Sequence, residues 1–220
     1  MALKAVLFDL DGTLLDTAPD FVTVLNRLRE EEGLPPLPDD AIRRSVSNGA
    51  RALIDLSFKL QRETPDFDRM LNRLLALYSE NLAVKTGLFA GMERVLHFIE
   101  QNHLTWGIVT NKSSLYTLPI LEALNLVPAP VAVICPDHVS KTKPDPEPLL
   151  LACQQMGCLP GETIYVGDHL RDIDCGRNAG VPTVAAAYGY IAEDDDAAAW
   201  RADYIVQQAD ELIDILNTHL

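Results

Sequence analysis

The sequence lacks several features that would mark a particular class of protein. Its four cysteines form no C-x-x-C pair, so neither a structural zinc site nor a disulfide framework is expected. No apolar run approaches the roughly 20 residues of a membrane span. The apolar segment before Asp9 is also too short for a signal peptide and has no small-residue cleavage site. We therefore expect a cytoplasmic protein without a membrane partner.

Basic residues are also scarce. There are 18 Lys and Arg against 32 Asp and Glu, which leaves a formal net charge of −14. Such an excess should repel nucleic acid and anionic membrane surfaces. An anionic small molecule could bind only where local cations reverse the field. Hydrophobic residues make up 48% of the 220, enough for one core with or without a small accessory domain.

Short apolar runs rich in Val and Ile recur along the chain, separated by helical patterns. The runs cover residues 5–8, 106–109, 131–134, 163–166, 183–186 and 204–206. Helical patterns between them include residues 92–101, 146–156 and 170–179. Continuously apolar runs are typical of strands buried on both faces. Their alternation with helices predicts an α/β fold, with a Rossmann-like parallel sheet between layers of helices.

The alternation stops between about residues 18 and 84, where only amphipathic helices are indicated. One apolar face ends before the stop signal Gly33, and it comprises Phe21, Val24, Leu25 and Leu28. A second comprises Phe67, Met70, Leu71, Leu74 and Tyr78. Between them, Asp39 or Asp40 is expected to cap a helix that runs through Val46. Residues 14–19 are interpreted as the entry to the first of these helices.

This helical segment could be an elaboration that only packs on the core. Because it leaves the sheet directly after the first pair of aspartates, we interpret it as a cap domain that covers the functional site. We assign residues 17–84 to an all-α cap, and residues 1–16 and 85–220 to the Rossmann-like core.

Polar side chains follow three of the expected strands, at the ends where open parallel sheets bind their ligands. They are Asp9, Asp11 and Thr13 after the first strand, Thr110 and Asn111 after the second, and Asp168 and Asp172 after the fourth. Lys143 precedes a helix that begins at a proline. Each has an ordinary explanation by itself: a turn at Asp11-Gly12, a helix cap at Thr110, a solvated lysine at 143. Together they predict one site at one edge of the sheet.

The predicted site has the composition of a magnesium centre. Carboxylates close together would repel one another without a cation, and oxygen ligands with room for water and phosphate suit Mg²⁺. We expect Asp9 and Asp168 to bind the metal, with the backbone carbonyl of Asp11 as a third ligand. Asp172 could bind the metal through water, or it could hold Lys143.

The same residues could carry out phosphoryl transfer. Asp9 would attack phosphorus and form an aspartyl-phosphate, which water then hydrolyses. Asp11 would protonate the leaving oxygen and later activate that water. Lys143 would offset the charge on the transferring group. We further expect phosphate-binding roles for Thr110, Asn111 and Gly12, the first two as hydrogen-bond donors and the glycine through close backbone approach.

The order and spacing of these residues resemble the four motifs of the haloacid dehalogenase superfamily. The motifs are Asp9-Leu10-Asp11-Gly12-Thr13, Thr110-Asn111, Lys143-Pro144, and Gly167-Asp168 with Asp172. The resemblance covers essentially the whole chain and implies a Rossmann-like core, an inserted helical cap and Mg²⁺-dependent chemistry on Asp9. True dehalogenases lack the second aspartate of the first motif, so Asp11 favours a phosphatase. One departure is His169, where relatives often carry Ser or Thr.

Within this superfamily the sequence resembles the phosphoglycolate phosphatase branch. The segment Cys135-Pro136-Asp137-His138-Val139 further resembles a subgroup that includes the N-acetylmuramic acid 6-phosphate phosphatases of peptidoglycan recycling. Both substrates carry a carboxylate as well as a phosphate. We expect an arginine of the cap to meet that carboxylate. The candidates are Arg43, Arg44 and Arg51, and Arg51 is preferred because it follows the Asn48-Gly49 turn.

The predicted function is Mg²⁺-dependent hydrolysis of a small phosphate monoester, either 2-phosphoglycolate or N-acetylmuramic acid 6-phosphate. One alternative is a sugar phosphomutase similar to β-phosphoglucomutase, which would return the phosphoryl group of Asp9 to a sugar. A signalling receiver domain would also place acids, a Thr and a Lys at strand ends, but it lacks the helical insertion and the partner acid Asp11. The choice of substrate, and of a monomer or a homodimer, is left open.

Overall fold

Six parallel strands form the central sheet of the computed structural model, which describes residues 2–220. In spatial order they are β5 (Ala132–Ile134), β4 (Thr105–Val109), β1 (Ala5–Phe8), β6 (Thr163–Gly167), β7 (Thr183–Ala186) and β8 (Tyr204–Val206). The chain builds outwards from β1 in both directions. The order therefore reverses around β1, and open sheets of this kind bind ligands at the carboxyl ends of the strands at that point.

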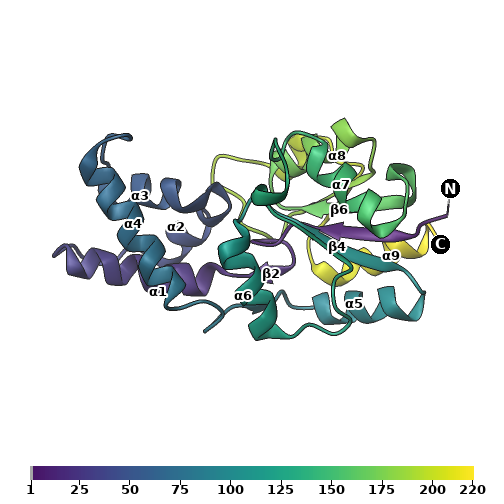
Figure 1. Cartoon of the computed structure of the whole chain (residues 1–220), viewed down its shortest axis with the longest axis horizontal. Coiled ribbons are helices and arrows are strands. Elements are labelled where there is room, and N and C mark those ends of the chain that lie inside the picture. The colour runs from purple at the N-terminus through teal and green to yellow at the C-terminus, as the bar shows by residue number, and fades with distance from the viewer. Residues whose placement is uncertain (1) are drawn as a thin grey trace.

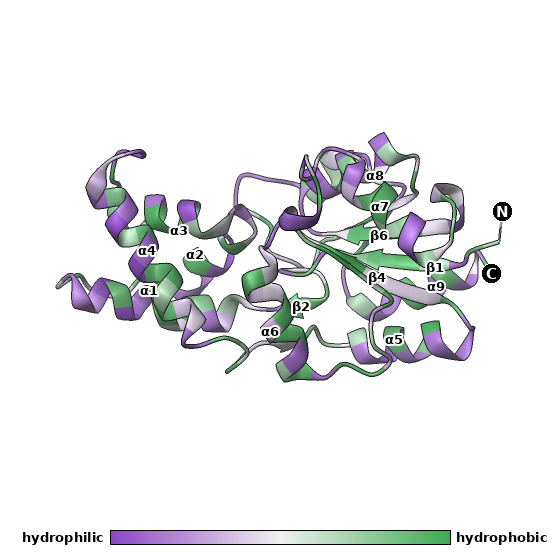
Figure 2. Cartoon of the chain, viewed as in Figure 1, coloured by the Kyte–Doolittle hydropathy of each residue, from purple (hydrophilic) through white to green (hydrophobic). Residues whose placement is uncertain are grey.

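Side chains alternate across β1 and divide the core into two layers. Val6 and Phe8 pack in one apolar cluster with helices α5 (Met92–Gln101) and α9 (Leu212–Asn217). Leu7 packs in the other, with α7 (Glu147–Met156) and α8 (Leu170–Ala179). Figure 2 shows apolar strands between helices that are polar on their outer sides. The predicted α/β architecture is confirmed, and every predicted strand lies within a residue of its observed bounds.

Four helices form a separate group at one end of the molecule, away from both chain termini (Figure 1). They are α1 (Ala18–Glu31), α2 (Asp39–Arg43), α3 (Gly49–Phe58) and α4 (Pro65–Ser79). The apolar residues that the helical spacing predicted on α1 and α4 are all buried. We refer to this group as the cap. The assignment of residues 17–84 to it stays a prediction.

The chain between α2 and α3 differs from the sequence-based expectation. The helix expected to run through Val46 ends at Arg43, and its N-cap is Pro38 rather than an aspartate. The hydroxyl of Ser45 donates back to the carbonyl of Ala41 at 3.2 Å, which competes with helix continuation. A short 3₁₀ turn, Val46–Asn48, follows instead.

A two-stranded ribbon connects the cap to the core. Strand β2 (Leu15–Asp16), predicted only as the entry to a helix, pairs antiparallel with β3 (Gly87–Leu88). A two-residue strand carries too little periodicity to be recognised in sequence. The ribbon lies where the chain leaves the core for the cap and where it returns. The remaining long helix, α6 (Ser114–Leu124), follows β4. Among residues 2–220, no helix has both the length and the hydropathy that a membrane crossing requires.

Candidate active site

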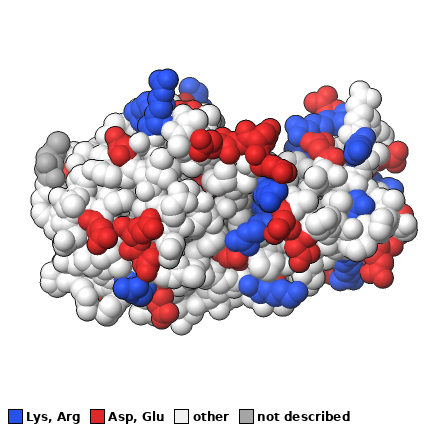
Figure 3. All heavy atoms as spheres, turned by 180° about the vertical axis from the view of Figure 1, so that it is seen from behind, with Lys and Arg blue, Asp and Glu red and all other residues white. Residues whose placement is uncertain are grey.

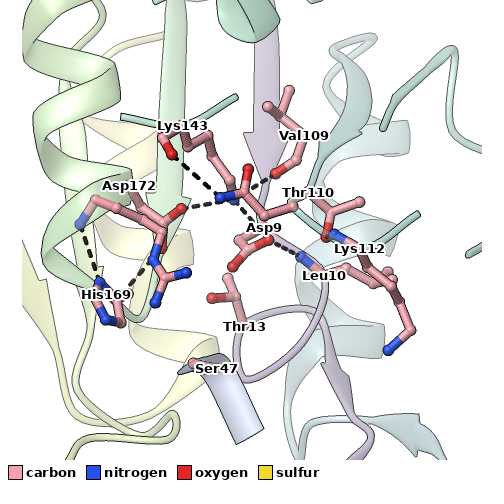
Figure 4. A network of polar contacts seen from close by, with 12 residues as sticks. Asp9, Leu10, Thr13, Ser47, Val109, Thr110, Lys112, Lys143, His169 and Asp172 are labelled. Carbon is pink, nitrogen blue, oxygen red and sulfur yellow. Dashed lines mark hydrogen bonds and ion pairs between the residues drawn. The ribbon is translucent and has the colours of Figure 1, made fainter. Parts of the chain in front are cut away.

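Lys143 lies at the centre of a buried polar network at the carboxyl edge of the sheet (Figure 4). Its Nζ lies 2.8 Å from Asp9 Oδ1 and 2.7 Å from Asp172 Oδ1, and it donates to the carbonyl of Val109 at 2.9 Å. The side chain is only 1% exposed. Burial by itself would lower the pKa of this lysine, but the two carboxylates outweigh it and raise the pKa above its usual value. Lys143 therefore remains a cation.

Tyr165 completes this network and was missed by the sequence analysis. Its hydroxyl lies 2.9 Å from Lys143 Nζ and 3.1 Å from Asp172 Oδ1. Within strand β6 it resembled one more core side chain. The available signal was a phenol in an otherwise aliphatic strand, since a buried Tyr hydroxyl usually has a hydrogen-bond partner.

Asp9 follows β1 directly and has one oxygen held and one free. The backbone N–H of Leu10 donates to Oδ1 at 2.7 Å, and Lys143 contacts the same atom. Within residues 2–220, no hydrogen bond reaches Oδ2. Burial raises the pKa of Asp9 to about 6, with Lys143 acting against this and Asp172 adding to it. The free oxygen is the one available to a ligand or to a phosphorus atom.

Asp168 is almost completely buried beside Asp9, and the cap contacts it. Thr13 Oγ1 donates to its Oδ1 at 3.3 Å, and Ser47 Oγ of the cap donates to its Oδ2 at 2.8 Å. Burial, followed by Asp9 and Asp172, raises the pKa of Asp168 to about 8. Without a cation the acids at this point oppose one another's ionisation.

The carboxylates fit a hard divalent cation. Ligand oxygens of Asp9, Asp168 and Asp172 all lie within 4.8 Å of one another. An all-oxygen donor set with mutual repulsion is the chemistry that Mg²⁺ relieves. Both oxygens of Asp172 are already engaged, one by Lys143 and the other by the backbone N–H of His169 at 3.1 Å. Asp172 thus holds Lys143, as one of the two sequence-based alternatives proposed, and its role as a metal ligand stays a prediction.

Gly12 makes room for this cluster. Its φ is +84°, and a Cβ added there would lie 2.0 Å from Asp168 Oδ2. Its conformational freedom was expected to allow the backbone to approach a phosphate closely. In the structure, the absence of a Cβ at Gly12 allows Asp168 to lie close to the first motif.

Asp11 forms a second ion pair, with Lys112, and this pair is partly buried. Its Oδ1 lies 2.9 Å from Lys112 Nζ and accepts a 2.5 Å hydrogen bond from Thr17 Oγ1. The same Nζ lies 4.9 and 4.8 Å from the ring centroids of Phe21 and Tyr78, on two helices of the cap. Burial alone would lower the pKa of Lys112, but Asp11 and then Tyr78 raise it above its usual value. Lys112 was not assigned a role from sequence, although it directly follows the second motif.

Thr110 and Asn111 differ in what they can offer a phosphate. Thr110 Oγ1 accepts from the backbone N–H of Lys112 at 3.0 Å, which leaves its O–H free to donate. Asn111 Nδ2 donates to the carbonyl of Lys143 at 3.2 Å. The asparagine side chain therefore braces the loop that carries Lys143, and its predicted contact with phosphate stays a prediction.

A cleft of about 280 Å³ separates the sheet edge from the cap. Its core side includes Asp9, Asp11, Thr110, Lys112 and Lys143. Its cap side includes residues 46–50, which form the 3₁₀ turn and the start of α3, together with Phe21, Leu75 and Tyr78. His169 and Arg171 also line it. This size is near the lower end of small-molecule sites, which is about 300 Å³. Predicted site residues of the first three motifs therefore line one cavity, whereas Asp168 and Asp172 of the fourth lie buried beside Asp9 and do not line it.

The cap arginines proposed as carboxylate contacts lie elsewhere. Arg51 is exposed, does not line the cleft, and has its guanidinium 5.8 Å from the ring centroid of Phe67. Arg43 pairs with Asp16 at 2.8 Å, and Arg44 with Glu193 at 3.3 Å. Arg51 lies outside the cleft because α3 begins at Gly49, and the helical periodicity from that start directs position 51 towards solvent.

Comparison with known proteins agrees with this arrangement. The family model for haloacid dehalogenase-like hydrolases matches residues 6–186, which include all four motifs. The chain belongs to this family. The predicted resemblance is confirmed, and with it the assignment of the protein as a hydrolase.

Several known proteins are similar to this hydrolase over nearly its whole length. It is 46% identical over 220 residues to the N-acetylmuramic acid 6-phosphate phosphatase of Pseudomonas aeruginosa, covering 100% of this chain and 97% of the relative. It is 39% identical over 209 residues to a phosphoglycolate phosphatase of Xanthomonas campestris, covering 95% and 94%. A crystal structure of a predicted phosphoglycolate phosphatase from Haemophilus somnus shares the fold, with a TM-score of 0.84, 24% identity and 97% coverage of both chains.

Proposed function

We propose that this hydrolase is a Mg²⁺-dependent phosphatase that removes the phosphate of N-acetylmuramic acid 6-phosphate. The observation that carries the proposal is the 46% identity, over the whole chain, to the Pseudomonas aeruginosa phosphatase of that name. A second phosphatase of the same name, from Pseudomonas putida, is 44% identical over 220 residues. The buried network of Asp9, Lys143 and Asp172 supports phosphoryl transfer as the chemistry. Such an activity would serve peptidoglycan recycling.

In the proposed first step, Asp9 Oδ2 attacks phosphorus while the ester bond to the sugar oxygen breaks. Lys143 and the Leu10 N–H hold Oδ1, so they orient the attacking oxygen. Asp11, protonated on Oδ2 before this step, gives that proton to the departing sugar oxygen. Lys112 and Thr17 both contact Asp11 Oδ1, which leaves Oδ2 for the proton. The products are the sugar alcohol and an aspartyl-phosphate.

In the second step, water attacks the phosphorus of the aspartyl-phosphate and the bond to Asp9 breaks. Asp11, now ionised, accepts a proton from that water. Lys143 and the Thr110 hydroxyl offset charge on the phosphoryl oxygens. When held by Asp9 and Asp168, Mg²⁺ would add further positive charge against the phosphate. Inorganic phosphate leaves and Asp9 is restored.

A second candidate substrate is 2-phosphoglycolate. It is favoured by the 39% identity to the Xanthomonas campestris phosphoglycolate phosphatase over 95% of this chain. The lower identity places it behind N-acetylmuramic acid 6-phosphate. Both molecules combine a phosphate monoester with a carboxylate.

The test is release of inorganic phosphate from N-acetylmuramic acid 6-phosphate, 2-phosphoglycolate and an aryl phosphate, with Mg²⁺ and with a chelator. We expect Mg²⁺-dependent release, the highest kcat/KM for N-acetylmuramic acid 6-phosphate, and no measurable turnover for Asp9→Asn. Asp174→Asn, a change of the same kind at a half-exposed residue that does not line the cleft, is the control. Full activity of Asp9→Asn would refute the aspartyl-phosphate, and sugar-phosphate isomerisation without phosphate release would indicate a mutase.

A further inference from the structure

Most cations of this protein already have an anionic partner. Within residues 2–220, eight of the twelve arginines lie within 4.0 Å of a carboxylate. On the face in Figure 3, basic side chains lie next to acidic ones. In the cleft, Lys143 pairs with Asp9 and Asp172, and Lys112 pairs with Asp11. With a net charge of −14, an unpaired cation in a cavity is an exception.

Arg171 is that exception. It is half-buried, lines the cleft, and among the described residues no carboxylate lies within 4.0 Å of its guanidinium. Its guanidinium donates from Nη2 to a neutral group, Asn48 Oδ1, at 3.3 Å. It is also the one arginine of the described chain that lines the cleft.

A second donor points at the same oxygen. His169 Nδ1 accepts from the backbone N–H of Arg171 at 3.1 Å, so the ring proton is assigned to Nε2. That Nε2 lies 3.3 Å from Asn48 Oδ1. Two donors from the core thus converge on one amide oxygen of the cap, both at long distances. A carboxylate oxygen would make shorter and stronger bonds with the same pair, because hydrogen bonds to a charged group are about twice as strong as neutral ones.

We propose that Arg171, assisted by His169 Nε2–H, binds the carboxylate of the substrate, and that Asn48 Oδ1 occupies this position when substrate is absent. The proposal rests on the proposed phosphatase function and names the part of the site that selects a carboxylated substrate. The residue that selects the substrate would then lie in the first turn of α8, three residues after Asp168, and would not be one of the cap arginines.

The geometry separates this contact from the chemistry. The backbone N–H of Arg171 supports the turn, whereas its guanidinium forms no hydrogen bond or ion pair with Asp9, Asp168 or Asp172 in the described chain. Changing the Arg171 side chain should therefore weaken binding of the substrate's carboxylate and leave the phosphate site unchanged. A planar guanidinium suits the two oxygens of a carboxylate better than an ammonium does.

The test uses two substrates that differ only in the lactyl ether, which carries the carboxylate. N-acetylglucosamine 6-phosphate has the phosphate of N-acetylmuramic acid 6-phosphate but no lactyl group. For Arg171→Met we expect kcat/KM for the muramic acid substrate to fall roughly 10- to 100-fold, with kcat/KM for the glucosamine substrate within about twofold of wild type. The kcat/KM of Arg171→Lys for the muramic acid substrate should lie between the values of wild type and Arg171→Met. Arg51→Met removes the same charge outside the cleft and should change neither value.

A binding experiment separates failure of this proposal from failure of the proposed function. Calorimetry with N-acetylmuramic acid, which has no phosphate, should show binding to wild type that is lost in Arg171→Met, while N-acetylglucosamine binds neither protein detectably. Three results for Arg171→Met would each overturn the assignment. They are an equal decrease of kcat/KM on both 6-phosphates, an unchanged kcat/KM on both, and unchanged binding of N-acetylmuramic acid. Absence of phosphate release by wild type from every ester, with binding intact, would instead refute the phosphatase function.

Discussion

At the scale of single residues, the site depends on which oxygen of each aspartate is held and which is free. Lys143 and the Leu10 N–H both contact Oδ1 of Asp9, and Lys112 and Thr17 both contact Oδ1 of Asp11. In each case the second oxygen is left to act on the substrate. Asp9 and Asp11 lie only two positions apart, but they have different proposed roles because a different lysine holds each of them.

Lys112 is expected to matter for catalysis although it is not itself proposed to touch the phosphate. Lys112→Met removes the charge that holds Asp11, and we expect kcat to fall roughly 10- to 100-fold because general acid–base catalysis contributes about 10²- to 10⁴-fold when it is correctly oriented. The decrease should be smallest for an aryl phosphate, whose leaving group needs little protonation. Steady-state kinetics on both kinds of ester measure this.

Lys141→Met is the matched control for this prediction, because Lys141 is 71% exposed and, among residues 2–220, its Nζ forms an ion pair with Asp145 alone. An equal decrease of kcat for aryl and sugar phosphates in Lys112→Met would argue against a role through Asp11.

At the scale of secondary-structure elements, the ribbon between core and cap is tied to the site by three side chains. Arg43 of the cap makes two contacts to Asp16 of β2, at 2.8 and 2.9 Å, and lies 4.9 Å from the ring centroid of Tyr190. The Tyr190 hydroxyl donates to Asp16 at 2.7 Å, and its backbone N–H donates to Asp168 Oδ2 at 2.9 Å. The position of the cap is thus linked to an expected metal ligand.

Arg43→Met should loosen this junction. We expect a loss of about 1–2 kcal/mol in the free energy of unfolding, from one ion pair, in which Nη1 contacts both oxygens of Asp16, and from contacts with aromatic rings. KM for the sugar phosphate should rise at the same time, because cap residues line the cleft. Urea denaturation and steady-state kinetics test both effects.

Arg44→Met provides the comparison, since the Glu193 partner of Arg44 is 88% exposed and a pair of this kind contributes little. If Arg43→Met and Arg44→Met had the same stability and the same KM, the junction would not depend on Arg43.

At the scale of the whole molecule, the buried acids make folding and metal binding interdependent. Burial and mutual repulsion raise the pKa values of Asp9 to about 6 and of Asp168 to about 8, so ionising them in the folded protein is costly. A cation bound only by the native state would remove that cost and would stabilise the entire fold by mass action.

Magnesium should therefore raise the melting temperature. At a concentration of about 100 times Kd the gain is about 2.7 kcal/mol, which corresponds to roughly 5–10 °C for a domain of this size. Asp168→Asn should fold but show no such rise, and Asp174→Asn should behave as wild type. Differential scanning calorimetry with Mg²⁺ and with a chelator measures this, and an equal rise in Asp168→Asn would place the metal elsewhere.

The sequence by itself determined the layout of the core. Short apolar runs that alternate with helical patterns are typical of strands in a covered parallel sheet, and the apolar periodicity of α1, α4, α5 and α8 is a local property of the sequence. The strand-end rule then predicted that Asp9, Thr110, Lys143 and Asp168 converge, because carboxyl ends of parallel strands share one edge.

Only the tertiary structure decided what each side chain contacts. The ribbon of β2 and β3, the partners of Tyr165 and Lys112, and the position of Arg51 outside the cleft depend on groups far apart in the chain. Arg171 had no distinguishing pattern in the sequence, because it became notable only through the absence of a carboxylate around it in the described fold. Local propensity predicts elements, whereas the pairing of charges depends on distances that only packing establishes.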